Sequence, residues 1–211
     1  MSRAAPAPRA AAVLPFVVAM LALTAAIASA GCSASPVDEA VATVRRLGGK
    51  VTFAADSPAA PSEVDLRKLP ITDADLANLA PLDMLTSLNL SDTPVSDNGL
   101  THLAGLKNLH TLYLGGTKLT DAGVKRLAGL QSLRMLHLGN TAVADGGMAT
   151  LAELPQLQTL YLGETKLSDK GLAKLEAAPS LRTLIVRSTL VTPAGIKQFY
   201  RARPRITLQG P

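Results

Sequence analysis

The sequence predicts an α/β fold, a right-handed solenoid with parallel strands on its concave face and short helices on its convex face. The main observation is a 24-residue phrase that occurs six times in succession. A degenerate first copy begins near Pro61, and the complete copies begin at Leu85, Leu109, Leu133, Leu157 and Leu181. A fixed period of this length is typical of solenoids, in which each repeat buries its apolar face only against its neighbours. Residues 61–205 therefore form six repeats.

Within each repeat the spacing of apolar residues changes from two to about 3.6. Positions are counted from the first residue of the repeat. Positions 4 and 6 are apolar, as in Leu112 and Leu114, so both side chains share one face of a short strand. Positions 16 and 19, such as Val124 and Leu127, have the spacing of one helix face. Each repeat is therefore expected to form a strand, a turn, a short helix and a return loop.

Three residue types recur at fixed positions between strand and helix. Aspartate at position 13, with serine or threonine beside it, is expected to cap the first amides of the helix. Glycine at position 15 is expected where neighbouring turns pack closely, since glycine weakens a helix. Threonine at position 9 is expected to bond backbone groups of the adjacent turn. The residues are Asp73, Asp97, Asp121, Asp145 and Asp169; Gly99, Gly123, Gly147, Gly171 and Gly195; and Thr93, Thr117, Thr141, Thr165 and Thr189.

The phrase LGGTKLTDAGVKRLAGL at residues 114–130 resembles a leucine-rich repeat. It is most similar to the cysteine-containing subtype, in which I-T-D-x-x-L-x-x-L follows the strand. Threonine stands here where that subtype often has cysteine or asparagine. The resemblance extends over residues 61–205 and implies a broad curved surface for binding, as in other solenoids. Nothing in the sequence resembles an F-box, so the resemblance does not imply ubiquitin-ligase work.

Both ends of the repeat region are expected to be capped, because an end repeat otherwise exposes its core. Residues 37–60 form the N-terminal cap, with a helix over 37–48, a strand over 50–54 and a Pro/Ala/Ser-rich loop over 55–63. At the other end Phe199 and Tyr200 replace smaller residues, and Pro204 ends the last helix. Residues 206–211 end the C-terminal cap, with a last short strand at 206–208.

Residues 1–31 resemble a bacterial lipoprotein signal peptide. Arg3 and Arg9 precede an uncharged apolar stretch over 10–30, and residues 28–32 (ASAGC) are similar to a lipobox. The resemblance implies cleavage before Cys32, the single cysteine of the chain, and lipid attachment to it. Residues 32–36 are then a short linker that holds the solenoid at a membrane of the cell envelope. Ser33 resembles the residue found in lipoproteins of the outer membrane, so the outer membrane or the periplasmic face is expected.

Two alternatives for the N-terminus remain open. Ser29 stands where a lipobox usually has leucine, so the signal also suits secretion in soluble form after cleavage behind Ala30. The apolar stretch is also long enough for an uncleaved membrane anchor, although Pro15 and the small residues at its end favour a signal peptide.

Composition and motifs argue against several functions. Removal of residues 1–31 lowers the formal net charge from +5 to +3, and no basic stripe alternates with aromatic residues, so nucleic acid is not an expected partner. The three histidines stand at unrelated repeat positions, and a metal site needs three or four converging ligands. No phosphate-binding loop or catalytic triad is indicated. We expect a monomer that is not an enzyme and that needs no cofactor or metal.

The candidate binding surface is the concave face of the sheet. Position 5 of each repeat points away from the core and contains Asp65, Asn89, Tyr113, His137, Tyr161 and Ile185. Adjacent strands lie ~4.8 Å apart, so the three rings are expected to lie side by side. Gly115, Gly139 and Gly163 leave the neighbouring column of positions open. The charges on concave positions have a weak positive bias, strongest toward the C-terminal end. Seven are basic (Arg67, Lys68, Lys118, Arg134, Lys166, Arg182 and Arg187) and four are acidic (Glu63, Asp65, Asp92 and Glu164).

The concave row suggests a site for an unidentified protein partner, because tyrosine is enriched at interface hot spots. Two alternatives remain. Tyr113 and Tyr161 also suit a glycan or peptidoglycan ligand, whose sugars stack on aromatic rings. The rings also suit simple cross-strand packing, which stabilises a sheet by about 0.2–1 kcal/mol per pair without any ligand.

Overall fold

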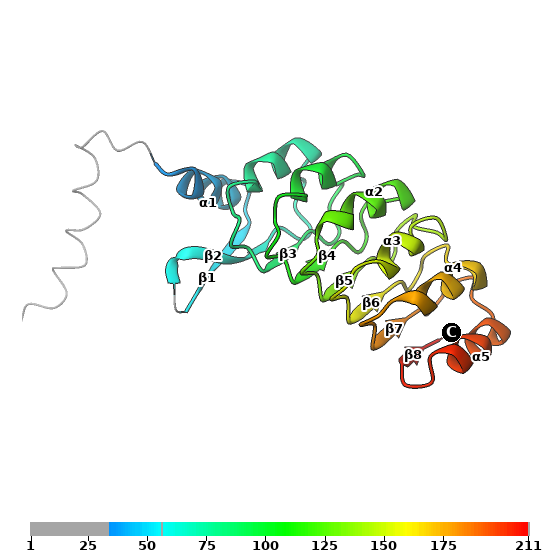
Figure 1. Cartoon of the computed structure of the whole chain (residues 1–211). Helices are drawn as coiled ribbons and strands as arrows, with labels where there is room; N and C mark the ends of the chain where they lie inside the picture. The colour runs from blue at the N-terminus through cyan, green and yellow to red at the C-terminus, as the bar shows by residue number, and fades with distance from the viewer. Residues whose placement is uncertain (1–33, 56, 211) are drawn as a thin grey trace, which may run out of the picture. The chain divides into compact units, whose positions relative to one another are not determined.

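The computed structural model describes residues 34–55 and 57–210, and Ser35–Pro211 form one compact unit. Its eight strands form one open sheet in sequence order, β1 to β8 (Figure 1). Only β1 and β2 are antiparallel; every later pair is parallel. The strands are β1 (Lys50–Ala54), β2 (Ser57–Asp65), β3 (Ser87–Asn89), β4 (Thr111–Tyr113), β5 (Met135–His137), β6 (Thr159–Tyr161), β7 (Thr183–Ile185) and β8 (Thr207–Gln209).

Short helices cover the other side of the unit and run roughly parallel to one another (Figure 1). They are α1 (Pro36–Arg46), η1 (Asp73–Leu79), η2 (Gly99–Leu103), α2 (Asp121–Arg126), η3 (Leu127–Gly129), α3 (Met148–Ala152), α4 (Asp169–Lys174), η4 (Leu175–Ala177) and α5 (Pro193–Ala202), where η marks a 3-10 helix. The repeats that form η1 and η2 carry Asp, Asn, Gly and Thr in this segment, and these residues have low helix propensity. The predicted α/β leucine-rich-repeat solenoid is confirmed.

The core lies between sheet and helices; leucine is its most frequent residue, and valine is the next most frequent. In the central strands the middle residue is fully buried and its two neighbours are half-buried, as period-two spacing requires. The register is one whole repeat throughout, so that Leu112 pairs with Leu88 on one side and Leu136 on the other. Each leucine therefore packs against the same position in the next repeat.

The N-terminal cap differs from its prediction in one respect. Helix α1 begins with a capping box at Ser35, whose hydroxyl accepts a hydrogen bond from the Asp38 amide at 3.1 Å, and it buries Ala40, Val41 and Val44. The segment expected to be a loop, residues 55–63, is instead mostly part of strand β2. Strand β1 needs a partner for its backbone, and the register shifts between Thr52 and Ala54 accommodate the proline-rich partner strand.

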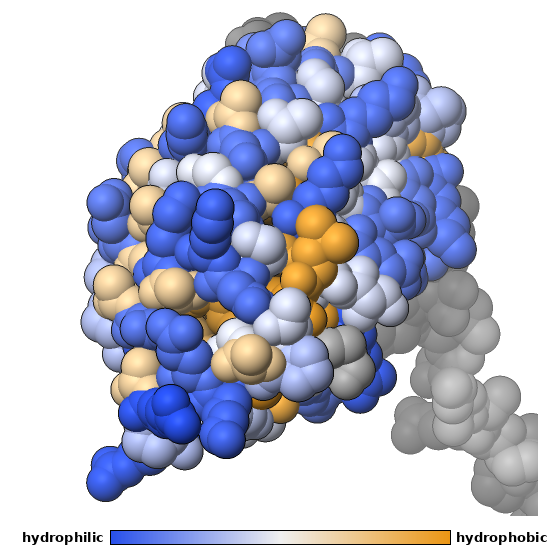
Figure 2. Space-filling view, turned by 90° about the vertical axis from the view of Figure 1, so that its right-hand side faces the viewer, coloured by the Kyte–Doolittle hydropathy of each residue, from blue (hydrophilic) through white to orange (hydrophobic). Residues whose placement is uncertain are grey.

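The C-terminal cap closes the core with α5 and β8. Phe199 is 1% exposed, and the Arg203 guanidinium donates hydrogen bonds to the carbonyl oxygens of Ala178 and Leu181. These bonds link the end of α5 to the loop that follows η4. The end of the solenoid is accordingly mostly hydrophilic, with one narrow apolar strip (Figure 2). No helix within the described ranges combines the length and the apolar character needed to cross a membrane.

The aspartates at position 13 link neighbouring repeats, and the prediction that they cap their own helix is wrong. Each carboxylate accepts a bond from the position-12 amide of the next repeat, as when Asp145 accepts from the Ser168 amide at 2.8 Å and from its hydroxyl at 2.5 Å. The prediction is confirmed for the hydroxyls beside these aspartates in three repeats, where Thr120, Ser168 and Thr192 accept from the amides of Ala122, Lys170 and Gly195. The other bonds involve Asp73 with Ser96, Asp97 with Thr120, Asp121 with Ala144 and Asp169 with Thr192.

Position 15 is glycine because the aspartate of the preceding repeat occupies the adjacent space. A Cβ atom added at Gly171 would collide with Asp145 Oδ1 and would lie 2.6 Å from a Leu167 methyl group. Close packing between turns is thus confirmed as the reason for this glycine. The threonines at position 9 are mostly buried, but they bond within their own repeat: Thr117 donates to the Leu114 carbonyl at 2.6 Å.

The link between repeats predicts a stability effect. Asp145→Ala removes the acceptor of both the amide and the hydroxyl of Ser168, so it should lower the free energy of unfolding by about 1–3 kcal/mol. Asp83→Ala is the matched control, because Asp83 is exposed and only its backbone carbonyl is bonded. This control should stay within about 0.5 kcal/mol of the wild type in denaturant unfolding. Equal effects of the two changes would refute the link.

Candidate functional site

The three rings of the concave row lie side by side, as the sequence predicts. Strand pairing aligns Tyr113 with His137 and His137 with Tyr161. The centroids of Tyr113 and His137 are 6.3 Å apart with planes tilted by 40°, and those of His137 and Tyr161 are 5.1 Å apart at 25°. All three side chains are half-buried rather than fully exposed. The geometry of the second pair is that of stacked rings, which attract one another.

The ring of His137 leans into the column of glycines at position 7. A Cβ atom at Gly115 would lie 2.6 Å from His137 Nδ1, and one at Gly139 would lie 3.0 Å from Cε1. Glycine at these positions therefore makes room for the imidazole. Nδ1 is buried and has no hydrogen-bond partner among the described residues. Burial holds the pKa of His137 below its usual range, because it disfavours the charged imidazolium, while the Asp92 carboxylate acts in the opposite direction.

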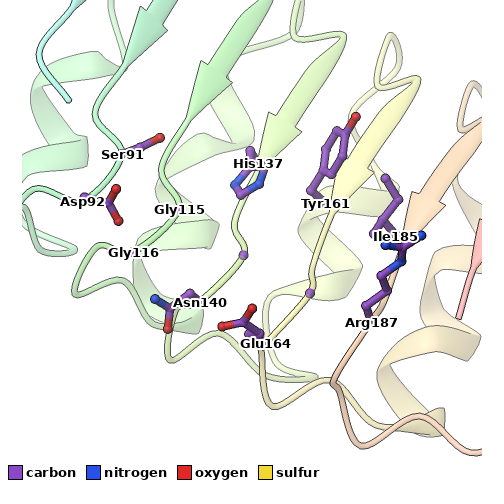
Figure 3. Close-up of a pocket in the computed structure, with 12 residues that line it drawn as sticks. Ser91, Asp92, Gly115, Gly116, His137, Asn140, Tyr161, Glu164, Ile185 and Arg187 are labelled. Carbon is purple, nitrogen blue, oxygen red and sulfur yellow. The ribbon is translucent and has the colours of Figure 1, made fainter. Parts of the chain in front are cut away.

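A hollow of about 440 Å³, here called the central depression, lies beside this row (Figure 3). Its lining comes from five consecutive repeats, and every lining residue stands at position 5, 7 or 8. The residues are Ser91, Asp92, Gly115, Gly116, His137, Gly139, Asn140, Tyr161, Gly163, Glu164, Ile185 and Arg187. The volume lies within the range of small-molecule and peptide-side-chain sites, ~300–1,000 Å³.

The floor of the central depression carries backbone amides that donate to no other residue within the described ranges. In the first two repeats the side chain at position 5 accepts a hydrogen bond from the amide at position 7. Asp65 accepts from the Arg67 amide at 3.1 Å, and Asn89 accepts from the Ser91 amide at 3.0 Å. The amides at position 7 therefore face the concave surface. Where position 5 is aromatic, no such bond forms, and the amides of Gly115, Gly139 and Gly163 have no protein acceptor. Gly163 is the most open of the three, because Gly115 and Gly139 are buried against the His137 ring.

The rim of the central depression is formed by residues with left-handed backbone conformation at position 8. Asp92, Asn140 and Glu164 have φ of 56°, 54° and 57°, and Gly116 has 69°. The sequence places Asp92 and Glu164 on the concave face, but Gly116, Asn140 and the left-handed backbone that the four share were not predicted. The signal was present, because Asp, Gly and Asn at one repeat position are the residues that adopt positive φ most readily.

The structure does not gather the predicted basic residues at the row. Only Arg187 lines the central depression, and its Nη2 donates to Gln209 Oε1 at 3.0 Å. Arg134 and Arg182 precede their strands at position 2, and Lys118 and Lys166 follow at position 10; all four are exposed. Asn89 lines a separate hollow with Tyr113 and Asp65. The central depression thus combines two carboxylates, Asp92 and Glu164, with one guanidinium.

Two further sets of predicted residues lie elsewhere. Cys32 and the whole signal segment 1–31 are outside the described residues. The histidines do not come together: His102 is exposed on η2, and His110 Nδ1 lies 2.6 Å from the Asn108 carbonyl oxygen. Within residues 34–55 and 57–210 there is no group of three or more His, Cys, Asp or Glu side chains with the geometry of a metal site.

Comparison with known proteins supports the repeat assignment. The family model described as leucine rich repeat matches residues 84–104 and 105–128. The fold is similar to internalin C2 of Listeria monocytogenes, with a TM-score of 0.51 and 20% identity over 86% of this chain and 100% of that chain. A leucine-rich repeat protein of Leptospira interrogans gives a TM-score of 0.52 and 21% identity over 70% of this chain. The chain covers 36% of that protein. No curated protein sequence matches the present chain.

The repeated phrase, the parallel sheet and these matches together show a leucine-rich-repeat fold, and the family model matches two segments of the repeat region. At 20% and 21% identity the likeness to the two solved structures concerns the fold. The two matches carry no information about the residues that line the central depression.

The buried imidazole predicts a pH effect on stability. Because the pKa of His137 is lowered in the folded state, the unfolded chain binds more protons as the pH falls below the usual histidine value of about 6.5. The contribution of His137 to stability is therefore complete above that pH and is lost as the pH falls through the lowered value. Urea unfolding at a series of pH values between about 7.5 and 5 should show wild type losing stability relative to His137→Asn. Parallel pH profiles would contradict this assignment.

Proposed function

We propose that this protein is a non-catalytic interaction module that binds a protein partner through its concave face. The observation that carries the proposal is the stacked row of Tyr113, His137 and Tyr161 beside the central depression. Half-buried aromatic side chains around a hollow are typical of the centres of protein interfaces. The solenoid fold supports this role in general, because stacked repeats present an extended concave surface.

Three features of the row favour binding over packing alone. The rings lie beside amides that donate to no described residue, whereas packing needs no free donors. The His137 ring is held in place by the glycines rather than by a hydrogen bond. The leucine core on the opposite side of the sheet is complete without the rings, since positions 4 and 6 are fully buried. The three rings therefore contribute little to the packing of the core and are available for contacts at the concave surface.

We further propose that the module is exported and held in the cell envelope as a lipoprotein through Cys32. The support is the sequence of residues 1–32, with its basic start, its apolar stretch and its lipobox-like end. One acyl chain binds a membrane only weakly, so stable attachment requires more than one. The lipoprotein resemblance supplies both the thiol and the new amino group of Cys32 as acylation sites.

Lipid attachment predicts a defined mass and location. The native protein should begin at Cys32 with added lipid in intact-mass analysis, and Cys32→Ala should move it from the membrane fraction to the soluble fraction. Ser33→Ala is the control, because it keeps the thiol and should stay with the membrane. A native chain that starts at Gly31 without lipid would contradict the lipoprotein assignment and favour ordinary secretion.

A glycan or peptidoglycan ligand is the second candidate, and the stacked geometry of His137 and Tyr161 favours it specifically. Sugar rings stack on such surfaces, and the exposed carboxylates of Asp92 and Glu164 are acceptors for hydroxyl groups. The two candidates use the same concave surface and differ only in the ligand, which is a protein in the first and a glycan in the second.

The concave row predicts a binding effect that exceeds its stability effect. In Tyr113→Ala/Tyr161→Ala the core is untouched, so circular dichroism should show a folded solenoid with a modest loss of stability. Binding should fall by roughly 30-fold or more, since removal of a hot-spot residue costs about 2 kcal/mol or more. Tyr200→Ala is the matched control, because Tyr200 lies on α5 away from the row and bonds the Leu208 carbonyl.

Photo-crosslinking in the cell envelope measures this effect. A photoreactive residue at Asn140 should give a discrete crosslinked product, and one at Lys125 on the convex helix α2 should give none. A protease-sensitive product supports a protein partner, whereas a product released by a glycan hydrolase supports the second candidate. Equal crosslinking from both positions, or an unchanged product in the folded double variant, would move the binding site away from the row.

A further inference from the structure

We propose that the central depression binds an extended polypeptide segment with two basic side chains four residues apart, one placed at Asp92 and the other at Glu164. The inference rests on the proposed function, because it specifies the partner that the concave face takes.

The charge of the rim favours a cationic segment. Asp92 and Glu164 are exposed, and within the described residues neither carboxylate forms an ion pair, the single ion pair there being Arg67 with Asp65. The one cation of the lining, Arg187, is directed to Gln209 on β8. The two carboxylates therefore face the hollow without a counter-charge, although the chain has more basic than acidic residues. A partner with basic side chains supplies what the rim lacks.

The spacing of the two acids determines the spacing of the basic residues. Asp92 and Glu164 stand at position 8, three repeats apart, with Gly116 and Asn140 between them. Three strand spacings of about 4.8 Å place them roughly 14 Å apart. An extended chain advances about 3.4 Å per residue and alternates its side chains, so residues i and i+4 share one face and lie about 13 Å apart. Residues i and i+3 point to opposite faces and fail this test.

The floor between the acids suits a polypeptide backbone. The glycines at positions 115, 139 and 163 put no side chain of their own on the floor, and the amide of Gly163, the most open of the three, is a donor for a carbonyl group of the segment. In Figure 3 Asp92 and Glu164 lie on either side of Asn140, with the rings of His137 and Tyr161 above the floor. The rings provide apolar area for the side chain at i+2. A neutral glycan would use the rings and the donors but would leave both carboxylates unneutralised.

The test uses two synthetic peptides of identical composition and charge. The first is Ala-Arg-Ala-Leu-Ala-Arg-Ala, with its arginines four residues apart and leucine at i+2, and the second is Ala-Arg-Ala-Leu-Arg-Ala-Ala, with its arginines three apart. Fluorescence anisotropy with the full chain, at low and at physiological salt, should show about tenfold tighter binding of the first peptide. Equal affinities would overturn the proposal, because they would indicate attraction without register.

Four single variants distinguish binding to the two rim carboxylates from a general effect of net charge on peptide affinity. Asp92→Asn and Glu164→Gln should each remove most of the preference for the first peptide, and asparagine tolerates the positive φ at position 92. Asp83→Asn and Glu153→Gln change the net charge by the same amount at exposed positions outside the depression, and they should retain the preference. Equal losses in all four would overturn the proposal, as would tight binding of peptidoglycan fragments that displaces the first peptide.

Failure of this inference is distinguishable from failure of the proposed function. Asp92→Asn/Glu164→Gln should abolish the envelope crosslink at Asn140, as the tyrosine double variant does. If the tyrosine variant loses the crosslink and the acid variant keeps it, the concave face binds a partner of other chemistry and the present inference is wrong. If both variants keep it, the proposed function itself is wrong.

Discussion

The whole structure depends on the fact that no repeat is able to bury its own leucines. A three-residue strand and one or two helical turns enclose no core, so each repeat must lie in register on the next, with Leu112 beside Leu88 and Leu136. The parallel ladder, the aspartate at position 13 and the glycine at position 15 all act across that one interface. Asp145 illustrates the coupling, because it bonds Ser168 of the next repeat and occupies the space that a side chain at Gly171 would need.

Strict register also determines what the surface offers. Because every repeat is displaced by the same vector, side chains at one position form a column, and the concave face is a set of such columns. Where position 5 is Asp65 or Asn89, the side-chain oxygen accepts a hydrogen bond from the amide two residues later, so this amide already has an acceptor within the protein. Where it is Tyr113, His137 or Tyr161, followed by glycine, the amides are left without protein acceptors and a hollow appears. The site therefore begins where the column changes composition.

The sequence predicts those features that follow from periodicity alone. The strands, the buried positions and the contact of the three rings all result from combining a period of two with a period of 24. Prediction from the sequence is wrong where one residue type is suited to two different roles. Aspartate before a helix suits a cap and an inter-repeat link equally, and only the position of the next repeat decides between them. The first part of β2, residues 57–63, was missed because prolines favour loops unless a bulged partner strand accommodates them, whereas its end at Val64 belongs to the predicted strand of the first repeat.

Stability and binding are divided between the two faces of the sheet, with one exception. The leucines at positions 4 and 6 determine the fold, and the residues at positions 7 and 8 can change with little effect on the core because they line a hollow. His137 belongs to both groups. Its ring stacks on Tyr161, and its Nδ1 is buried against Gly115, so it shapes the floor and is itself fixed by it. A side chain at Gly115 would displace the imidazole and close the hollow without touching the leucine core. The glycine column is therefore as much a determinant of the site as the rings, even though glycine has no functional side chain.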